Sequence, residues 1–100
     1  MAIKVFITRE FKPERINEAY QLLMQLRSAV TLQGGYISGQ TLISADSPNR
    51  IVVVSTWASR KRWEAWKASD ERNRFLGKLD SFMSAPEKVE VFLTGGQGAD

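Results

Sequence analysis

Residues 50–63 read RIVVVSTWASRKRW, and this stretch decides the fold. The segment Arg50–Trp57 is rich in β-branched residues, which is typical of a strand. Positions 51–54 are all aliphatic, so this strand is apolar on both faces and is predicted to lie in the centre of a sheet. Ser59 follows as a helix N-cap, which predicts a short helix directly after the central strand.

Downstream of the central strand, a second serine divides the helical region. Ser69 is another N-cap, and the acidic residues after it suit the positive end of a helix, so we predict a bend near this position. Apolar residues then recur at helical spacing up to Met83, and Pro86 ends the pattern. In residues 89–94 the aliphatic side chains fall on alternate positions, which predicts a further strand.

Upstream of the central strand, the sequence predicts a strand, a helix and a second strand. Ala2–Glu10 has the period-two pattern of a strand, and Pro13–Leu32 has a helical repeat of apolar residues that a diglycine ends. Tyr36–Ala45 is the next predicted strand, and the turn residues at 46–49 join it to the central strand as a hairpin.

The order of the predicted elements is strand, helix, strand, strand, helix, strand. This order favours an α+β fold, namely a ferredoxin-like βαββαβ sandwich with a four-stranded antiparallel sheet. We expect residues 1–100 to form a single domain, with a core over about 2–93 and a loose C-terminal tail at 95–100.

One face of such a sheet is left uncovered by the helices, and in a monomer that face carries polar side chains. This sequence departs from that pattern. Phe6 in the first strand, and Val52 and Val54 in the central strand, lie opposite to aliphatic residues, so both faces of the sheet are apolar. A second copy of the chain is the simplest cover, and we predict a homodimer.

The composition excludes several classes of protein and of chemistry. Of the 100 residues, 43% are hydrophobic and 25% are charged, which is the balance of a globular domain. No apolar run approaches the ~20 residues that span a bilayer, and the N-terminus lacks the pattern of a signal peptide, so we expect a cytoplasmic protein without a membrane partner. The chain has no cysteine and no histidine, which removes disulfides, thiolate nucleophiles, zinc–thiolate sites and the usual neutral-pH base.

The net charge of +3 does not predict a nucleic-acid partner, because the basic residues are spread along the chain. Their one concentration, at residues 60–62, is either an attractor for an anionic ligand or the solvated first turn of a helix. An RNA-binding domain of the same topology would need basic residues and exposed aromatics on its central strands, and residues 51–57 lack that pattern.

Residues 57–69, WASRKRWEAWKAS, resemble the signature of the antibiotic-biosynthesis-monooxygenase family. The signature is a tryptophan that closes a strand, a capped helix, an aromatic-x-x-Trp pair and a serine. Residues 36–39 after the diglycine and the Ser-Pro pair at 47–48 fit the same pattern, so the resemblance covers about residues 2–93. It implies a dimeric α+β barrel with a pocket in each subunit between the sheet and the helices.

The resemblance implies several functions, because members of this family differ in chemistry. Some oxidise reduced polycyclic aromatic compounds with oxygen and no cofactor, some degrade haem, some isomerise small ligands, and some have no assigned activity. We expect a cofactor-independent monooxygenase acting on a small reduced aromatic or quinol-like compound, with no cofactor and no metal. The alternative is a non-catalytic dimeric module for small-ligand binding or stress response.

Two positions argue against haem degradation. The haem-degrading branch has an asparagine near the end of the first strand and an iron-ligating histidine further along, and by motif these positions fall on Thr8 and Leu76. A leucine side chain cannot ligate iron. The tryptophan of that branch is retained as Trp66.

The resemblance and the residue types together select six candidates for the substrate pocket. Trp66 is the first, since an indole stacks on a flat aromatic ligand and donates one hydrogen bond; core packing is its alternative role. Trp63 leans further towards the core. Thr8 either orients substrate or water through its hydroxyl, or is an ordinary strand residue. Leu76 is also a candidate, because it occupies the position of the iron-ligating histidine in the motif.

The other two candidates are Tyr36 and Arg27. Tyr36 opens a strand, where a tyrosine commonly packs at the end of a sheet. Arg27 falls close to the apolar arc of its helix, where it either binds an anionic or phenolate oxygen or covers apolar surface with its aliphatic stem. Arg9 and Glu10 are equally well interpreted as a surface pair. No residue has a spacing that identifies it as a catalytic base, so none is assigned.

Overall fold

Four antiparallel strands form one sheet in the order β2-β3-β1-β4 in the computed structural model, which describes residues 1–95. The strands are β1 Ile3–Glu10, β2 Tyr36–Ile43, β3 Arg50–Trp57 and β4 Lys88–Leu93. The central position predicted for Arg50–Trp57 is confirmed, because β3 pairs with β1 on one side and with β2 on the other. From residue 96 onwards, the predicted loose tail lies outside the described residues.

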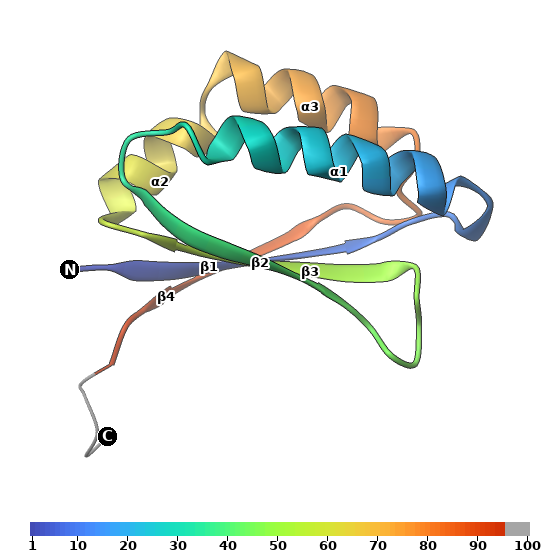
Figure 1. Cartoon of the computed structure of the whole chain (residues 1–100), viewed down its shortest axis with the longest axis horizontal. Helices are drawn as coiled ribbons and strands as arrows, with labels where there is room; N and C mark the ends of the chain where they lie inside the picture. The colour runs from blue at the N-terminus through green and yellow to red at the C-terminus, as the bar shows by residue number, and fades with distance from the viewer. Residues whose placement is uncertain (96–100) are drawn as a thin grey trace.

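Three α-helices cover one side of this sheet and leave its other side open (Figure 1). They are α1 Ile16–Val30, α2 Arg60–Lys67 and α3 Asp70–Asp80, with a 3-10 turn over Pro13–Arg15 before α1. The α+β ferredoxin-like fold is therefore confirmed. Within residues 1–95, no helix is both long enough and apolar enough to cross a membrane.

Two serine caps explain the break between α2 and α3. The backbone N–H of Arg62 donates to Ser59 Oγ at 3.2 Å, and the backbone N–H of Arg72 donates to Ser69 Oγ at 3.1 Å. Each hydroxyl pairs an N–H group that has no partner inside its own helix, so the chain can start a new helix at each serine. The predicted bend near Ser69 is thus a change of helix.

The core lies between the sheet and the helices. Alternation along β1 directs Ile3, Val5 and Ile7 into it, and all three are buried. The opposite side chains of the sheet remain partly exposed: Phe92 is 47% and Leu42 is 44% exposed, and Phe6 packs edge-on against Phe92 at 5.2 Å between ring centroids. The open face of the sheet therefore carries the apolar cluster that the sequence predicts, among polar side chains such as Lys4 and Glu90.

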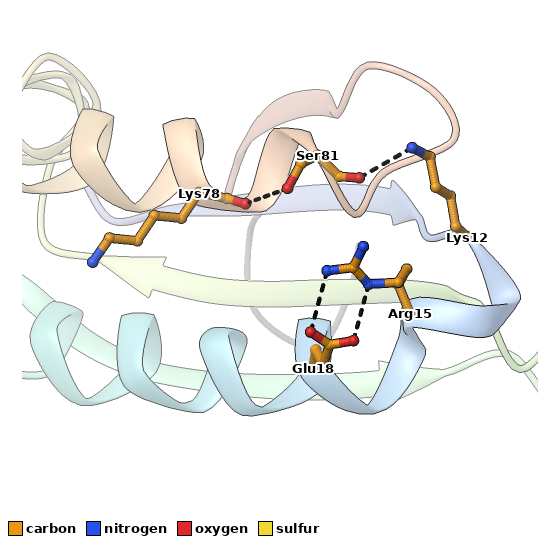
Figure 2. Close-up of polar contacts among 5 residues, drawn as sticks. All are labelled: Lys12, Arg15, Glu18, Lys78 and Ser81. Carbon is orange, nitrogen blue, oxygen red and sulfur yellow. Dashed lines mark hydrogen bonds and ion pairs between the residues drawn. The ribbon is translucent and has the colours of Figure 1, made fainter.

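Polar contacts lie where the segment before α1 meets the end of α3 (Figure 2). Lys12 Nζ donates to the carbonyl of Ser81 at 3.1 Å, and the Ser81 hydroxyl donates to the carbonyl of Lys78 at 3.2 Å. Arg15 and Glu18 form an ion pair at 2.9 Å on the surface of this end. Of these three contacts, the one between Lys12 and Ser81 joins the segment after β1 to the end of α3, while the other two are local.

A glycine at the entrance to β2 is required by the backbone. Gly35 has φ of +88°, and a Cβ built there would lie 2.5 Å from Cγ of Arg62. We expect Gly35→Ala to lower the free energy of unfolding by about 1–2 kcal/mol, since other residues are strained in this region of φ. Urea unfolding measures the change.

Gly77→Ala is the matched control for this substitution. Gly77 lies inside α3, and a Cβ there meets no atom within 4 Å. Alanine favours an exposed helix over glycine by about 0.5–1 kcal/mol, so this variant is expected to be more stable than the parent. Equal effects of the two substitutions would contradict the assigned role of the Gly35 conformation.

Candidate functional site

A cavity of about 50 Å³ lies between the sheet and the helices. Side chains from β1, β2, β3 and all three α-helices line it. Arg27 is an exposed lining residue on the helix side of the sheet, so it marks where the cavity reaches the surface. An apolar cavity of about 150 Å³ holds benzene, so an aromatic ring enters this one only if wall side chains move or if part of the ligand stays at the opening.

Aromatic rings form much of the cavity wall. Trp57 packs edge-on against Tyr36 at 5.5 Å and against Trp63 at 5.7 Å between ring centroids. Trp66 is buried and lines the same cavity. Trp57 Nε1 donates to Ser55 Oγ at 3.1 Å, so the N–H of this buried indole has an acceptor. The wall thus presents aromatic rings that suit a flat ligand.

Two buried arginines share one carboxylate beside these rings. Arg9 Nε donates to Glu87 Oε2 at 3.0 Å, and Arg72 Nη2 donates to Glu87 Oε1 at 3.0 Å. The side chains of Arg9 and Arg72 are only 2% and 3% exposed, whereas Glu87 is 17% exposed. With two guanidinium groups against one carboxylate, this triad carries a net charge of +1.

The charge of the triad persists in spite of its burial. Burial lowers the pKa of Arg9, the charge of Glu87 opposes that shift, and the charge of Arg72 adds to it. Arginine nevertheless stays protonated in proteins, because its guanidinium gives up a proton only at very high pH. Both Arg9 and Arg72 line the cavity, so the positive charge lies in its wall.

Strand alternation places Arg9 in the core, and the interpretation of Arg9 and Glu10 as a surface pair is wrong, because Arg9 is buried and pairs with Glu87. Position 9 lies on the same face of β1 as Ile3, Val5 and Ile7. This period-two pattern was the available signal for a buried arginine. The sequence offered no comparable signal for its partner, because Glu87 lies 78 residues away along the chain.

Four of the six candidate pocket residues line the cavity: Trp66, Trp63, Tyr36 and Arg27. Thr8 and Leu76 do not. Thr8 points to the open face of the sheet together with Phe6, since both alternate with buried residues of β1, and Leu76 packs against the edge of the core. The side chain that the end of β1 directs to the cavity is Arg9 in place of Thr8.

Arg27 and Tyr36 are positioned by β2. Arg27 donates to the carbonyl of Gly39 at 3.3 Å and to Thr41 Oγ1 at 3.4 Å, two long hydrogen bonds of an exposed side chain. A Cβ on Gly39 would lie 2.3 Å from the Tyr36 hydroxyl oxygen. The absence of a side chain at Gly39 therefore lets the phenol of Tyr36 lie against the strand beside the cavity.

The family model for antibiotic biosynthesis monooxygenases (ABM) matches residues 2–78, which is most of the chain. The chain belongs to the ABM family. The matched range includes every residue of the aromatic wall, whereas Glu87 and β4 lie beyond it. No curated protein matches this sequence significantly.

Solved structures share the fold of this ABM chain at low sequence identity. A proposed antibiotic biosynthesis monooxygenase of Caulobacter crescentus has a TM-score of 0.88 at 17% identity, covering 95% of this chain and 91% of the other. A second, from Nitrosomonas europaea, has 0.86 at 19% identity, covering 96% and 90%. SnoaB, a cofactor-independent oxygenase of Streptomyces nogalater, has 0.85 at 11% identity, covering 96% and 95%. At these identities the likeness extends to the fold alone.

Among residues 1–95 of this ABM chain, no group of three or more acidic, cysteine or histidine side chains is arranged to hold a metal ion. The chemical groups that the cavity presents are instead indole rings, one phenol, a few hydroxyls and guanidinium groups. Such a wall can bind a flat ring by stacking and can donate hydrogen bonds to its oxygen substituents.

Proposed function

We propose that this protein is a cofactor-independent monooxygenase that acts on a small, reduced aromatic or quinol-like compound in the cavity. Membership of the ABM family supports an oxygenase, and the fold is shared with a cofactor-independent oxygenase. The observation that carries the proposal is the cavity wall, in which Trp57, Trp63, Trp66 and Tyr36 surround a space with few polar groups.

The substrate supplies every electron in this reaction. A ring methylene of an anthrone-like compound loses its two C–H bonds, one oxygen atom of O₂ forms the new C=O group, and the other leaves as water. The protein therefore has to bind the substrate, orient its methylene and favour its deprotonated form. Tyr36 lines the cavity with an ionisable hydroxyl, whereas Glu10, Glu18 and Glu64 do not line it.

Arg27 is the side chain that we expect to move when a substrate enters. It is exposed, it lies where the cavity reaches the surface, and its two hydrogen bonds to β2 are long. Its displacement enlarges the opening without disturbing the buried wall. In this position its guanidinium is also available to a substrate oxygen.

We further propose that the protein works as a homodimer that pairs the open faces of two sheets in an α+β barrel. The proposal is supported by the apolar side chains on that face, including Phe6, Val52, Val54 and Phe92, which the helices do not cover. Burying this surface against a second copy removes it from water.

The direct test is oxygen consumption by metal-free protein with a panel of anthrones, quinols and flavonols. We expect protein-dependent uptake that Trp66→Ala reduces about tenfold, since an aromatic contact contributes about 0.5–1.5 kcal/mol beyond its burial. An oxygen electrode measures the rate per folded protein, with the folded fraction taken from circular dichroism.

Leu79→Ala is the matched control, because Leu79 is fully buried in the same core and does not line the cavity. It destabilises the protein by removing packing, yet it is expected to keep the rate per folded molecule. Saturable quenching of tryptophan fluorescence without any oxygen uptake would replace the oxygenase by the second candidate, a module that binds a small ligand without consuming it.

A further inference from the structure

Two buried side-chain nitrogens at the cavity make no hydrogen bond within residues 1–95. They are Arg9 Nη2 and Trp63 Nε1. Arg9 Nη2 is in ion-pair contact with Glu87 Oε2 at 3.0 Å, an oxygen that already accepts from the neighbouring Nε, so Trp63 Nε1 is the donor with no polar contact. Leaving a buried donor unpaired costs about 1–3 kcal/mol, and native proteins rarely do so. Both residues line the same cavity, so a ligand with acceptor oxygens can pair them.

The charges around the cavity favour an anion over a neutral acceptor. Three arginines, Arg9, Arg27 and Arg72, line it, and no aspartate or glutamate among residues 1–95 does. Glu87 neutralises one of the two buried guanidinium groups, and both of its oxygens are already engaged. The Arg72 guanidinium also lies 5.4 Å from the centroid of the Trp63 ring, so one unpaired donor and the excess positive charge belong to the same cluster.

We propose that this cavity binds its aromatic ligand as the phenolate anion, with Arg9 and Trp63 donating hydrogen bonds to ligand oxygens and Arg72 supplying charge. The inference rests on the proposed function and deepens it by naming the ionisation state of the substrate. On binding, the O–H bond of the phenol breaks, its electron pair stays on the oxygen, and the proton passes to water. A cluster of fixed positive charge thereby does the work for which the chain has no histidine base.

The test is a titration of 4-nitrophenol, a small single-ring probe whose phenolate absorbs visible light and whose phenol does not. The absorbance of the bound probe is followed across pH under nitrogen, with dissociation constants measured on either side of its pKa. We expect the pKa of the bound probe to fall by about one unit, which corresponds to about tenfold tighter binding of the anion. An unchanged pKa, or no saturable binding, overturns the inference.

Two substitutions in the triad are expected to shift the pKa of the bound probe in opposite directions. Glu87→Gln increases the positive charge at the cavity, so it is expected to tighten phenolate binding and to lower the probe pKa further. Arg9→Met is expected to return the pKa to that of the free probe. General damage to the fold weakens binding in both variants, so loss of phenolate binding by folded Glu87→Gln protein contradicts the charge argument. Arg60→Met, which removes an exposed arginine outside the cavity, is expected to leave the titration unchanged.

Trp63→Phe keeps an aromatic ring and removes the Nε1 donor. It therefore tests the proposed hydrogen bond to the ligand oxygen if Arg9→Met does not fold. We expect it to weaken phenolate binding severalfold while neutral phenol binds as before. Benzoate is the comparison ligand, and a preference for benzoate over 4-nitrophenolate would overturn the assignment to a phenolate. The titration needs no turnover, so the two proposals can fail separately. A lowered probe pKa without oxygen uptake contradicts the oxygenase function alone. Oxygen uptake without a lowered probe pKa contradicts phenolate binding alone.

Discussion

Glu87→Gln is expected to lower the free energy of unfolding by about 3 kcal/mol. The substitution keeps the size of the side chain and removes the carboxylate charge that Arg9 and Arg72 share at 3.0 Å. Both guanidinium groups then remain buried and charged, without a counter-charge and facing one another. Breaking a buried ion pair in this way costs about 3–5 kcal/mol, and the partial exposure of Glu87 argues for the lower end. Urea unfolding followed by circular dichroism measures the loss.

Glu18→Gln is the control, because it makes the same chemical change in an exposed ion pair. Glu18 pairs with Arg15 at 2.9 Å, and the two side chains are 60% and 41% exposed (Figure 2). Water and salt screen such a pair, which contributes less than about 1 kcal/mol. If the two variants lose the same amount of stability, the buried triad does not hold β1, α3 and the segment before β4 together as described.

Val54→Lys is expected to weaken dimerisation by at least about a hundredfold. Val54 lies on the open face of β3, the central strand, opposite Phe6 of β1 and Gln40 of β2. In a two-fold symmetric interface each substitution enters twice, so two lysines would be placed in the apolar part of the dimer interface. A cost of a few kcal/mol for burying unpaired charge corresponds to this loss of affinity. Light scattering and sedimentation across protein concentrations give the dissociation constant.

Gln21→Lys adds the same charge to an exposed position of α1, away from the open face, and is expected to leave the dimer intact. Circular dichroism of the Val54→Lys monomer is expected to match that of the parent, because Val54 lies outside the core between sheet and helices. A parent protein with the mass of a single chain at all concentrations would rule out the proposed dimer.

The two predictions concern opposite faces of the same sheet. On the helix side, β1 directs Arg9 into a cavity with a net positive charge. On the other side, Phe6 and Thr8 of the same strand face the proposed partner subunit. Neighbouring residues of a strand point to opposite faces of the sheet. Adjacent positions of β1 therefore serve the proposed substrate cavity and the proposed dimer interface.

The sequence by itself determined the elements and their order. The aliphatic run at 51–54 identified the central strand, because a strand that is apolar at every position has to be covered on both faces. Ser59 and Ser69 identified both helix starts, since a hydroxyl N-cap acts on a backbone N–H only three residues away. These signals are local or periodic, so they can be recognised without knowing which helices and strands pack together.

The charged part of the candidate site was decided by tertiary structure alone. Arginines are seldom buried, so nothing in the chain marks Arg9 and Arg72 as members of one buried cluster, although alternation along β1 gave a hint for the first. Their common partner Glu87 lies 78 residues from Arg9 and 15 from Arg72. Whether distant charges meet depends on how β1, α3 and the segment before β4 pack together. That packing is fixed by the whole core, and no local pattern encodes it.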